Sequence, residues 1–390
     1  GIYMSQSNAL VVLRAFGNDF EALINETILP VAMSRLRGQL TMPRLISVDK
    51  ADESKKVGEL IRVNKPIEFG SADEHGTGAS VATDLSVEKV ELRLNRHPYK
   101  EFKMSDREFT GMQPGAIPDA LAAAVDVLAR EVNKAIFDMY TEVPYFSGAL
   151  ASTNARDKKD LIQARKDLNN RKVLGDKNLV LTSDTEADLL GIFTVGNEQP
   201  AEKEGIIGRR FGFDIYSDVQ APMHFSGTAS ASNGIKTSVA GNVGSSLLVL
   251  SGAGANATFV KGDILTVAGT DQVFAVTADI VADEDGAVAV AVTPEITTAI
   301  ASGTSVAVVG DHPVDLAFSK SAFLIAFRQL ETPANAPGVT MGSMTDPETG
   351  ITLRLLSWYN ASTESTHWKL ETLFGTKAVA PERASRLGGH

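Results

Sequence analysis

The residues with the clearest potential for chemistry are a glycine-rich run, an acidic turn and six histidines. Residues 252–257 read GAGANA and follow a predicted strand, which mimics the pattern of a dinucleotide-binding loop. Such a loop requires a helix that opens at the third small residue, because the helix N-terminus binds the pyrophosphate. Here Thr258, Phe259 and Val260 follow, which is typical of a strand. We therefore predict a loop between strands, and no cofactor.

Metal-binding and catalytic patterns are missing from the sequence. Residues 283–286 read DEDG, but the distal glutamate of a calcium loop is absent, so we predict a solvated turn. The histidines at positions 75, 97, 224, 312, 367 and 390 show no ligand spacing and no partner set, and we predict no metal site. The chain has no cysteine, no GxxxxGKS/T phosphate loop and no GxSxG elbow. These absences favour a protein that is not an enzyme and has no catalytic residues.

Length and charge narrow the class of protein further. The 390 residues exceed what one compact domain usually holds, so we expect two or more domains. The net charge of −11 argues against a dominant phosphate-binding surface, since such a surface needs clustered Lys and Arg. The sequence lacks a run of about 18 apolar residues, so we expect no membrane partner. Asp19, Glu21 and Glu26 interrupt the N-terminal apolar residues, so we expect no export signal.

Two segments show the periodicity of helices. Residues 18–37 repeat apolar side chains at helical spacing, and Pro30 is expected to kink or split that helix. The pattern is clearer at 117–140, where Pro118 suits the first turn. We interpret this segment as a core-spanning helix, with a coiled-coil seam as the alternative. Its apolar stripe consists of Ile117, Leu121, Val125, Leu128, Val132, Ile136 and Met139.

An extended hairpin is predicted between residues 57 and 94. Residues 60–69 read as a strand interrupted by Pro66, and residues 87–94 alternate cleanly between apolar and polar side chains. The residues between them include a polar, glycine-rich tip at 70–79. Because a two-stranded hairpin is marginal alone in water, we expect it to lie against something else, such as another copy of the chain.

The middle of the chain reads as a mixed α/β region interrupted by a β-module. Within 157–223, helices at 157–171 and 186–192 alternate with strands at 179–181 and 213–216. From Phe211 to Phe327 the sequence has no arginine, and Gly, Ala, Ser, Thr and Val dominate. Short strands separated by polar turns predict a small β-barrel or sandwich inserted at about 225–312. The predicted strands are 246–250, 264–267, 272–277, 287–292 and 305–309.

The last forty residues combine a two-strand unit with a distinctive tail. Trp358, Tyr359 and Trp368 lie in the unit and either pack in its own core or form an interface. The tail at 374–384 reads FGTKAVAPERA, which closely resembles the C-terminal end of tailed-phage major capsid proteins, in particular the coat proteins of short-tailed Salmonella phages. Three further stretches resemble the same family in order: KVGELIRVNKP at 56–66, FGFDIY at 211–216 with Pro222, and KGD at 261–263.

The resemblance implies the Hong Kong 97-type capsid fold. This is an α+β fold with a long spine helix, here 117–140, an extended β-hairpin loop that lies over a neighbouring subunit, and an inserted small β-barrel domain. The implied parts are an N-terminal arm (1–56), the hairpin loop (57–94), a peripheral domain (95–156), an axial α/β domain in two parts (157–224 and 313–349), the insertion (225–312), and a terminal β-unit that returns to the peripheral domain (350–390).

The function implied by the resemblance is structural. The chain would be a major capsid protein whose hexamers and pentamers close into an icosahedral shell around double-stranded DNA, assembled in the host cytoplasm and found in the virion. Its partners would be its own copies, scaffolding and portal proteins, non-specifically enclosed DNA and, as a further candidate, a decoration protein. The residues expected to contact neighbouring subunits are Arg62, Lys65, Glu68, Asp73, Glu74 and His75.

Two other functions stay open at this point. One is a compartment on the same fold that encloses cargo protein instead of a genome. The other is a secreted β-rich adhesive or glycan-binding protein, which the Ser/Thr/Gly-rich module favours and the missing export signal disfavours. The contents of any particle distinguish the first alternative from a capsid, and a protein that never assembles would favour the second.

Overall fold

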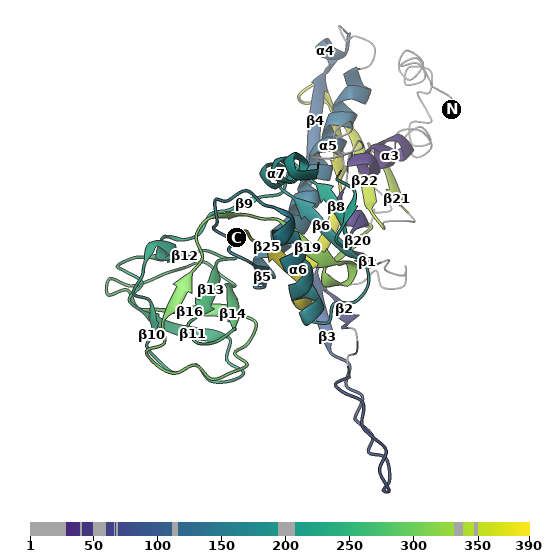
Figure 1. The fold of residues 1–390 in the computed structure, drawn as a ribbon. Coiled ribbons are helices and arrows are strands. Elements are labelled where there is room, and N and C mark those ends of the chain that lie inside the picture. Colours follow the sequence, from purple (N-terminus) through teal and green to yellow (C-terminus); the bar gives the residue numbers. More distant parts are fainter. Residues whose placement is uncertain are drawn as a thin grey trace. The chain divides into compact units, whose positions relative to one another are not determined.

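The structure is a computed structural model that describes residues 29–39, 41–49, 60–65, 67, 69–110, 116–193, 207–330, 338–346 and 350–390. The chain forms two compact units, each built from three segments. The first unit takes residues up to 39, 48–129 and 324–379, and the second takes 40–47, 130–323 and 380–390. Strands dominate and helices are few, so the chain is α+β, as predicted (Figure 1).

A six-stranded mixed sheet forms the centre of the second unit. Its order is β5 (Phe146–Ser147), β25 (Ala384–Leu387), β19 (Leu316–Ser319), β6 (Lys177–Leu181), β8 (Phe213–Ser217) and β7 (Arg209–Arg210). β6 and β8 run parallel, which requires a crossover, and α7 (Ser183–Phe193) lies in that connection. α6 (Lys158–Asn170) begins at Asp157, whose side chain forms a capping box with Asp160. The helices and strands predicted for 157–216 are therefore present.

Residues between β9 (Met223–His224) and β18 (His312–Pro313) form a β-structure with a core of its own. The antiparallel order is β10 (Lys236–Thr237), β11 (Leu247–Ser251), β16 (Val288–Thr293), β14 (Val273–Val276), β13 (Ile264–Val267) and β17 (Val306–Val308). The sheet nearly closes, because Val306 N donates to Ile235 O at 2.9 Å and Lys236 bridges Ser305. Its core side chains include Leu248, Leu250, Phe259, Leu265, Phe274, Val276 and Val290.

The strands predicted for this module are β11, β13, β14, β16 and β17. Burial alternates along β16, as expected for a strand with one face on a core. Residues 252–257 form a loop before β12 (Thr258–Phe259), which pairs with β15 (Ile280–Val281). The acidic segment 283–286 is a turn in which the Asp283 side chain accepts from Asp285 N at 3.0 Å and Ala287 N at 2.8 Å.

A four-stranded antiparallel sheet is the largest β-structure of the first unit. Its order is β21 (Val339–Thr345), β22 (Thr352–Asn360), β23 (Ser365–Glu371) and β4 (Tyr99–Ser105). Alternation puts Leu353, Leu355, Trp368 and Leu370 on one buried face. α3 (Leu29–Gln39) contacts β21 and β22, and the short α4 (Asp106–Thr110) follows β4.

α5 (Ala116–Phe137) is the longest described helix and corresponds to the helix predicted at 117–140. It ends at Phe137, because residues 138–142 tighten into the 3-10 helix η4 (Asp138–Glu142). The described stripe residues Leu121, Val125, Leu128, Val132 and Ile136 are buried. Of the helix predicted at 18–37, α3 contains the last part, with Pro30 in its first turn, and residues 18–28 lie outside the described residues. Among the described helices, none is long and apolar enough to cross a membrane.

The predicted hairpin forms from β2 (Leu60–Asn64) and β3 (Lys89–Arg93), which pair antiparallel from Leu60 opposite Arg93 to Asn64 opposite Lys89. Both strands are shorter than predicted. The base of the hairpin packs on the sheet β1 (Ser47–Asp49), β20 (Leu324–Arg328) and β24 (Leu373–Lys377). The apolar side chains that join them are Ile61, Leu92, Leu94, Leu324 and Ala326.

Gly375 allows the hairpin base to approach β24 closely, since a Cβ there would lie 2.1 Å from the Arg93 carbonyl oxygen. Gly375→Ala is therefore expected to displace β3 and to lower the free energy of unfolding by about 1–3 kcal/mol. Urea unfolding, together with hydrogen exchange at Leu92 and Leu94, measures the effect. Gly76→Ala is the matched control, because no atom lies within 4 Å of its added Cβ. Equal stability of the two variants would contradict this role for Gly375.

The C-terminal part of the chain is divided between the two compact units. Residues 324–379 lie in the first unit and 380–390 in the second, and the boundaries of the axial domain at 313–349 and of the terminal β-unit at 350–390 stay a prediction. β20 belongs to the first unit because it pairs with β24, and β25 to the second because it pairs with β19 and β5. The remaining 3-10 segments are η2 (Met42–Arg44), η5 (Thr228–Ala231), η6 (Lys320–Ala322) and η7 (Pro381–Arg383).

Candidate functional site

The hairpin continues beyond its paired strands as an arm at residues 65–88, drawn as the two narrow dark-blue traces that extend from β2 and β3 in Figure 1. After the hydrogen bond from Lys65 N to Glu88 O at 2.8 Å, every described residue from 67 to 88 is exposed. Phe69 is 68% and Val81 87% exposed. Isolated exposed apolar side chains are normal, whereas several of them on one exposed arm favour an interaction with a partner. The apolar side chains of the arm are Ile67, Phe69, Val81, Leu85 and Val87.

The residues predicted to contact a neighbouring subunit lie in different parts of this hairpin, some near its paired strands and others near its tip. Arg62 and Lys65 pair with charges on the opposite strand, with Arg62 Nε 3.6 Å from Glu91 and Lys65 Nζ 3.9 Å from Glu88. Asp73, Glu74 and His75 are exposed near the tip, and Glu68 lies outside the described residues. Their contact with another subunit stays a prediction.

Sequence reasoning missed the apolar side chains of the arm. The signal was present, because Ile67 and Phe69 alternate with polar residues before the tip, and Val81, Leu85 and Val87 follow it. The polar tip carries the predicted contact residues, whereas burial of apolar area contributes most of the free energy of association. The charged residues of the arm are better suited to orientation and choice of partner.

Glu371 is the centre of a charge cluster on the more polar face of the terminal sheet. Its side chain is 0% exposed and accepts hydrogen bonds from Arg354 and from His97 Nε2, the latter at 2.8 Å. Lys369 Nζ lies 3.5 Å from the same carboxylate. Burial alone would raise the pKa of Glu371, but the hydrogen bond and charge of Arg354, with smaller contributions from His97 and Lys369, hold the pKa below its ordinary value.

Of the three aromatic residues of the terminal β-unit, one packs in the core of the sheet and two are partly or largely exposed. Trp368 is buried and stacks on Phe102 with ring centroids 5.4 Å apart, so it belongs to the core of the sheet. Trp358 is partly exposed and stacks on His367 at 5.2 Å. Tyr359 is 52% exposed, and its hydroxyl donates to Asp106 at 2.7 Å. Trp358 and Tyr359 therefore remain accessible to a partner.

Two of the six histidines, which are far apart in the sequence, lie together in the structure. His224 and His312 lie opposite each other on the paired strands β9 and β18, with ring centroids 5.1 Å apart. Asp263 and Arg386 contact this pair. The sequence held a signal, because one histidine stands at each end of the predicted insertion. Only antiparallel pairing of the two ends brings them together.

A second group joins Asp157, Asp160 and His390, whose possible ligand atoms lie within 4.8 Å of one another. Both carboxylates already serve the N-terminus of α6. Asp157 accepts from Lys159 N at 2.8 Å, and Asp160 accepts from Asp157 N at 2.9 Å. We assign this group to helix capping.

No family model and no curated protein matches the sequence. Among solved structures, one of Mycobacterium phage Che8 aligns with 90% of this chain and 89% of that chain, at 13% identity and a TM-score of 0.48. The capsid of a native GTA particle aligns with 90% of this chain and 91% of that chain, at 10% identity and 0.48. A virus-like particle from Pyrococcus furiosus aligns over 91% and 95%, at 11% identity and 0.39.

Proposed function

We propose that the chain is a major capsid protein of a tailed phage, whose hexamers and pentamers close into an icosahedral shell around double-stranded DNA. The tail at 374–384, which resembles this family, supports the proposal. In this reading α5 is the spine helix of the peripheral domain. The sheet of β6, β8 and β19 with α6 and α7 is the axial domain, and the nearly closed sheet within 225–312 is the inserted domain.

The exposed arm at 65–88 is the observation that carries the proposal. A two-stranded hairpin is marginal in water, and this one carries large apolar side chains without a cover in the described part of its own chain. An arm that reaches a neighbour enlarges the buried area, and obligate interfaces commonly exceed about 2,000 Å². A shell needs such repeated contacts between unlike surfaces of identical chains.

Charge favours a second copy of the chain as the cover. From 66 to 88 the arm carries acidic residues but no Lys or Arg, and Asp73, Glu74 and Asp84 are exposed. The polar face of the terminal sheet carries cations, of which Lys103 is exposed and Lys369 partly exposed. The exposed Lys103 on this face is complementary in charge to the acidic arm of another copy, and such complementarity orients association.

Electron microscopy of the purified protein, expressed with and without its neighbouring genes, tests the proposal. Closed shells, tubes or spirals are the expected result, and nuclease-protected double-stranded DNA in particles from the full gene set would identify a capsid. Packaged protein without DNA would favour the cargo compartment. A protein that stays monomeric or dimeric under every condition would overturn the shell and favour a binding protein. Scaffolding, portal and decoration proteins would be sought in the same preparations.

Deletion of residues 70–79 at the hairpin tip is expected to leave the monomer folded and to weaken assembly. The segment is exposed throughout, so its removal costs no core contact within the chain. Circular dichroism reports the fold, and sedimentation velocity reports the assembled fraction. Particles of normal yield and size from this variant would argue against a role of the tip between subunits.

A further inference from the structure

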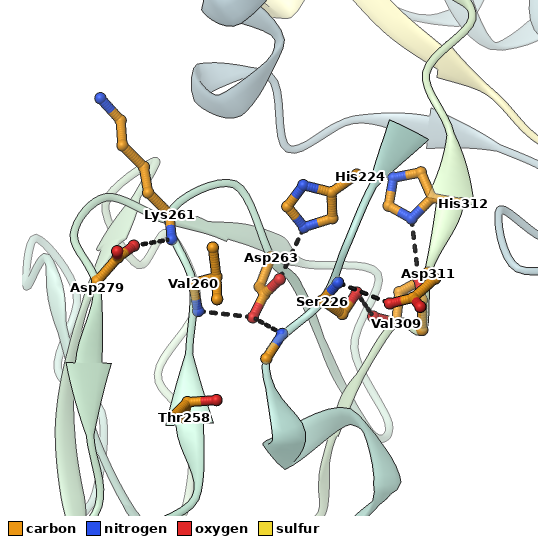
Figure 2. A network of polar contacts seen from close by, with 12 residues as sticks. His224, Ser226, Thr258, Val260, Lys261, Asp263, Asp279, Val309, Asp311 and His312 are labelled. Carbon is orange, nitrogen blue, oxygen red and sulfur yellow. Dashed lines mark hydrogen bonds and ion pairs between the residues drawn. The ribbon is translucent and has the colours of Figure 1, made fainter. Parts of the chain in front are cut away.

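Two short strands, each with one histidine, connect the insertion (225–312) to its host, by which we mean the rest of the second unit. β9 and β18 pair antiparallel, with His224 opposite His312, and Val314 N donates to Pro222 O at 3.0 Å. Both imidazoles are almost completely buried, and Figure 2 shows them side by side. One apolar cluster joins insertion and host, with Leu150 and the partly buried Phe146 of the host against Ile264, Ala275 and the partly buried Val309. Buried hydrogen bonds lie at the connecting strands beside this cluster.

His224 connects the host to the insertion directly. Its Nδ1 lies 2.9 Å from the hydroxyl oxygen of Tyr140 in η4, and its Nε2 lies 2.7 Å from Asp263 Oδ1 in the turn before β13. The second carboxylate oxygen of Asp263 accepts from Gly227 N at 3.1 Å and Val260 N at 2.9 Å (Figure 2). The buried Asp263 carboxylate therefore hydrogen-bonds both to the connecting strand, at His224, and to neighbouring backbone of the insertion, at Gly227 and Val260.

His312 connects the other strand to Arg386 of β25. Arg386 is fully buried, and its guanidinium donates to His312 Nε2 at 3.1 Å and to Tyr140 O at 2.8 Å. Because a guanidinium can only donate, His312 Nε2 has to accept. The proton of His312 therefore lies on Nδ1, which donates to Gly310 O at 2.9 Å. Only a neutral His312 satisfies both contacts.

We propose that His312 is the proton-sensitive part of a latch that holds the insertion on its host at neutral pH and releases it on acidification, while both parts stay folded. Protonation removes the lone pair that accepts from Arg386 and puts a second cation against a buried guanidinium. Opening of the junction brings both cations into water. This inference concerns the single chain and does not rest on assembly into a shell.

The surroundings of His312 explain why release requires acid. Burial, and secondarily the charge of Arg386, lower the pKa of His312 from 6.5 to about 4. Burial also lowers the pKa of Arg386 to about 10, so Arg386 keeps its charge throughout this range. The groups that face the junction are Tyr140 and Asp138 of η4, His224 of β9, Asp263 of the turn, Asp311 of the connecting segment and Arg386 of β25.

The direction of the pH dependence follows from these values. Above pH 6.5 His312 is neutral whether the latch is closed or open, so the equilibrium constant for closing the latch has its highest value. Between pH 6.5 and about 4 only the open state takes up a proton on His312. The equilibrium constant for closing the latch therefore falls roughly 300-fold over that interval. His224 has the Asp263 carboxylate on one side and the Tyr140 hydroxyl on the other, so it does not share the arrangement of His312 against a guanidinium.

Spin-label distances test the latch, and the absence of native cysteine makes the labelling specific. Lys166→Cys on α6 of the host and Glu284→Cys on a turn of the insertion are exposed positions. We expect a narrow distance distribution at pH 7.5 and a broad one at pH 4, with far-UV circular dichroism unchanged. His312→Gln offers an oxygen to Arg386 but cannot take up a proton, so its distribution should stay the same across this pH range.

His312→Asn is the second variant, and in either variant that folds the pH dependence should disappear. His75→Gln, at the exposed hairpin tip, is the matched control and should broaden like the parent protein. Three results would overturn the latch. They are a narrow parent distribution at pH 4, equal broadening in His312→Gln and the parent, and loss of the circular dichroism signal together with the broadening, which would indicate global unfolding.

Discussion

Replacement of Phe69 and Leu85 together by serine is expected to leave the monomer folded and to raise the concentration needed for assembly by roughly 30- to 900-fold. The two side chains are 68% and 66% exposed, so the change removes little contact within the chain. Complete burial of such a side chain contributes about 1.5–3 kcal/mol. In the proposed shell a neighbour would cover only the exposed part, so the two side chains together would contribute roughly 2–4 kcal/mol per subunit contact. Light scattering over a concentration series measures the threshold.

The control for this prediction keeps the same arm and changes polar residues on it. Ser80→Ala with Ser86→Ala removes no apolar area, and both positions are exposed. We expect its assembly threshold to match that of the parent protein. If both double variants assemble at the parent concentration, the arm is not buried between subunits. If both monomers lose stability, the effect lies in folding rather than in assembly.

Glu371→Gln is expected to lower the free energy of unfolding of the first unit by about 2–4 kcal/mol. The carboxylate is 0% exposed and faces Arg354, His97 and Lys369, so the amide would leave these donors and charges without their common anion. This loss of free energy is expected to be no larger than that for breaking a fully buried ion pair. The reason is that Arg354 and Lys369 are 14% and 26% exposed and remain partly hydrated. Urea unfolding with a probe in the terminal sheet measures it.

The same substitution predicts a defined pH dependence. The pKa of Glu371 lies below the ordinary 4.5, so its stabilisation is complete above pH 4.5 and is lost as the pH falls through the lowered value. The difference between parent and Glu371→Gln should therefore be constant from pH 7 to 5 and disappear in stronger acid. Glu101→Gln, whose carboxylate is 36% exposed beside His367, is the control and should cost less than about 1 kcal/mol. Equal losses in both variants would contradict the central role of Glu371.

The two acid responses can be separated experimentally. Loss of the His312 latch begins below pH 6.5 and concerns the second unit, whereas loss of the Glu371 cluster begins below pH 4.5 and concerns the first. The directions agree, but the causes differ. His312 is held neutral by burial, and Glu371 is held ionised by surrounding cations. At pH 5.5 the latch should therefore be weakened while the terminal sheet keeps its full stability.

Local patterns determined much of this protein. The stripe from Leu121 to Ile136 predicted α5, and the spaced strands between 246 and 309 predicted the inserted sheet. The alternation of residues 87–94 predicted one strand of the hairpin. These predictions succeed because helix and strand periodicity are set by neighbours within a few residues. The α+β class and the extended hairpin follow from the same short-range information.

Only the tertiary structure decided which distant residues meet. His224 and His312 are separated by the whole insertion, and Arg386 reaches them from the last strand. Glu371 gains its charge partners through pairing with β22 and through His97, which lies near the start of β4. Residues 324–328 and 384–387 lie in different compact units, because their sheet partners are far away in sequence. Side-chain pattern predicts that a strand exists, but its partner depends on the packing of the complete chain.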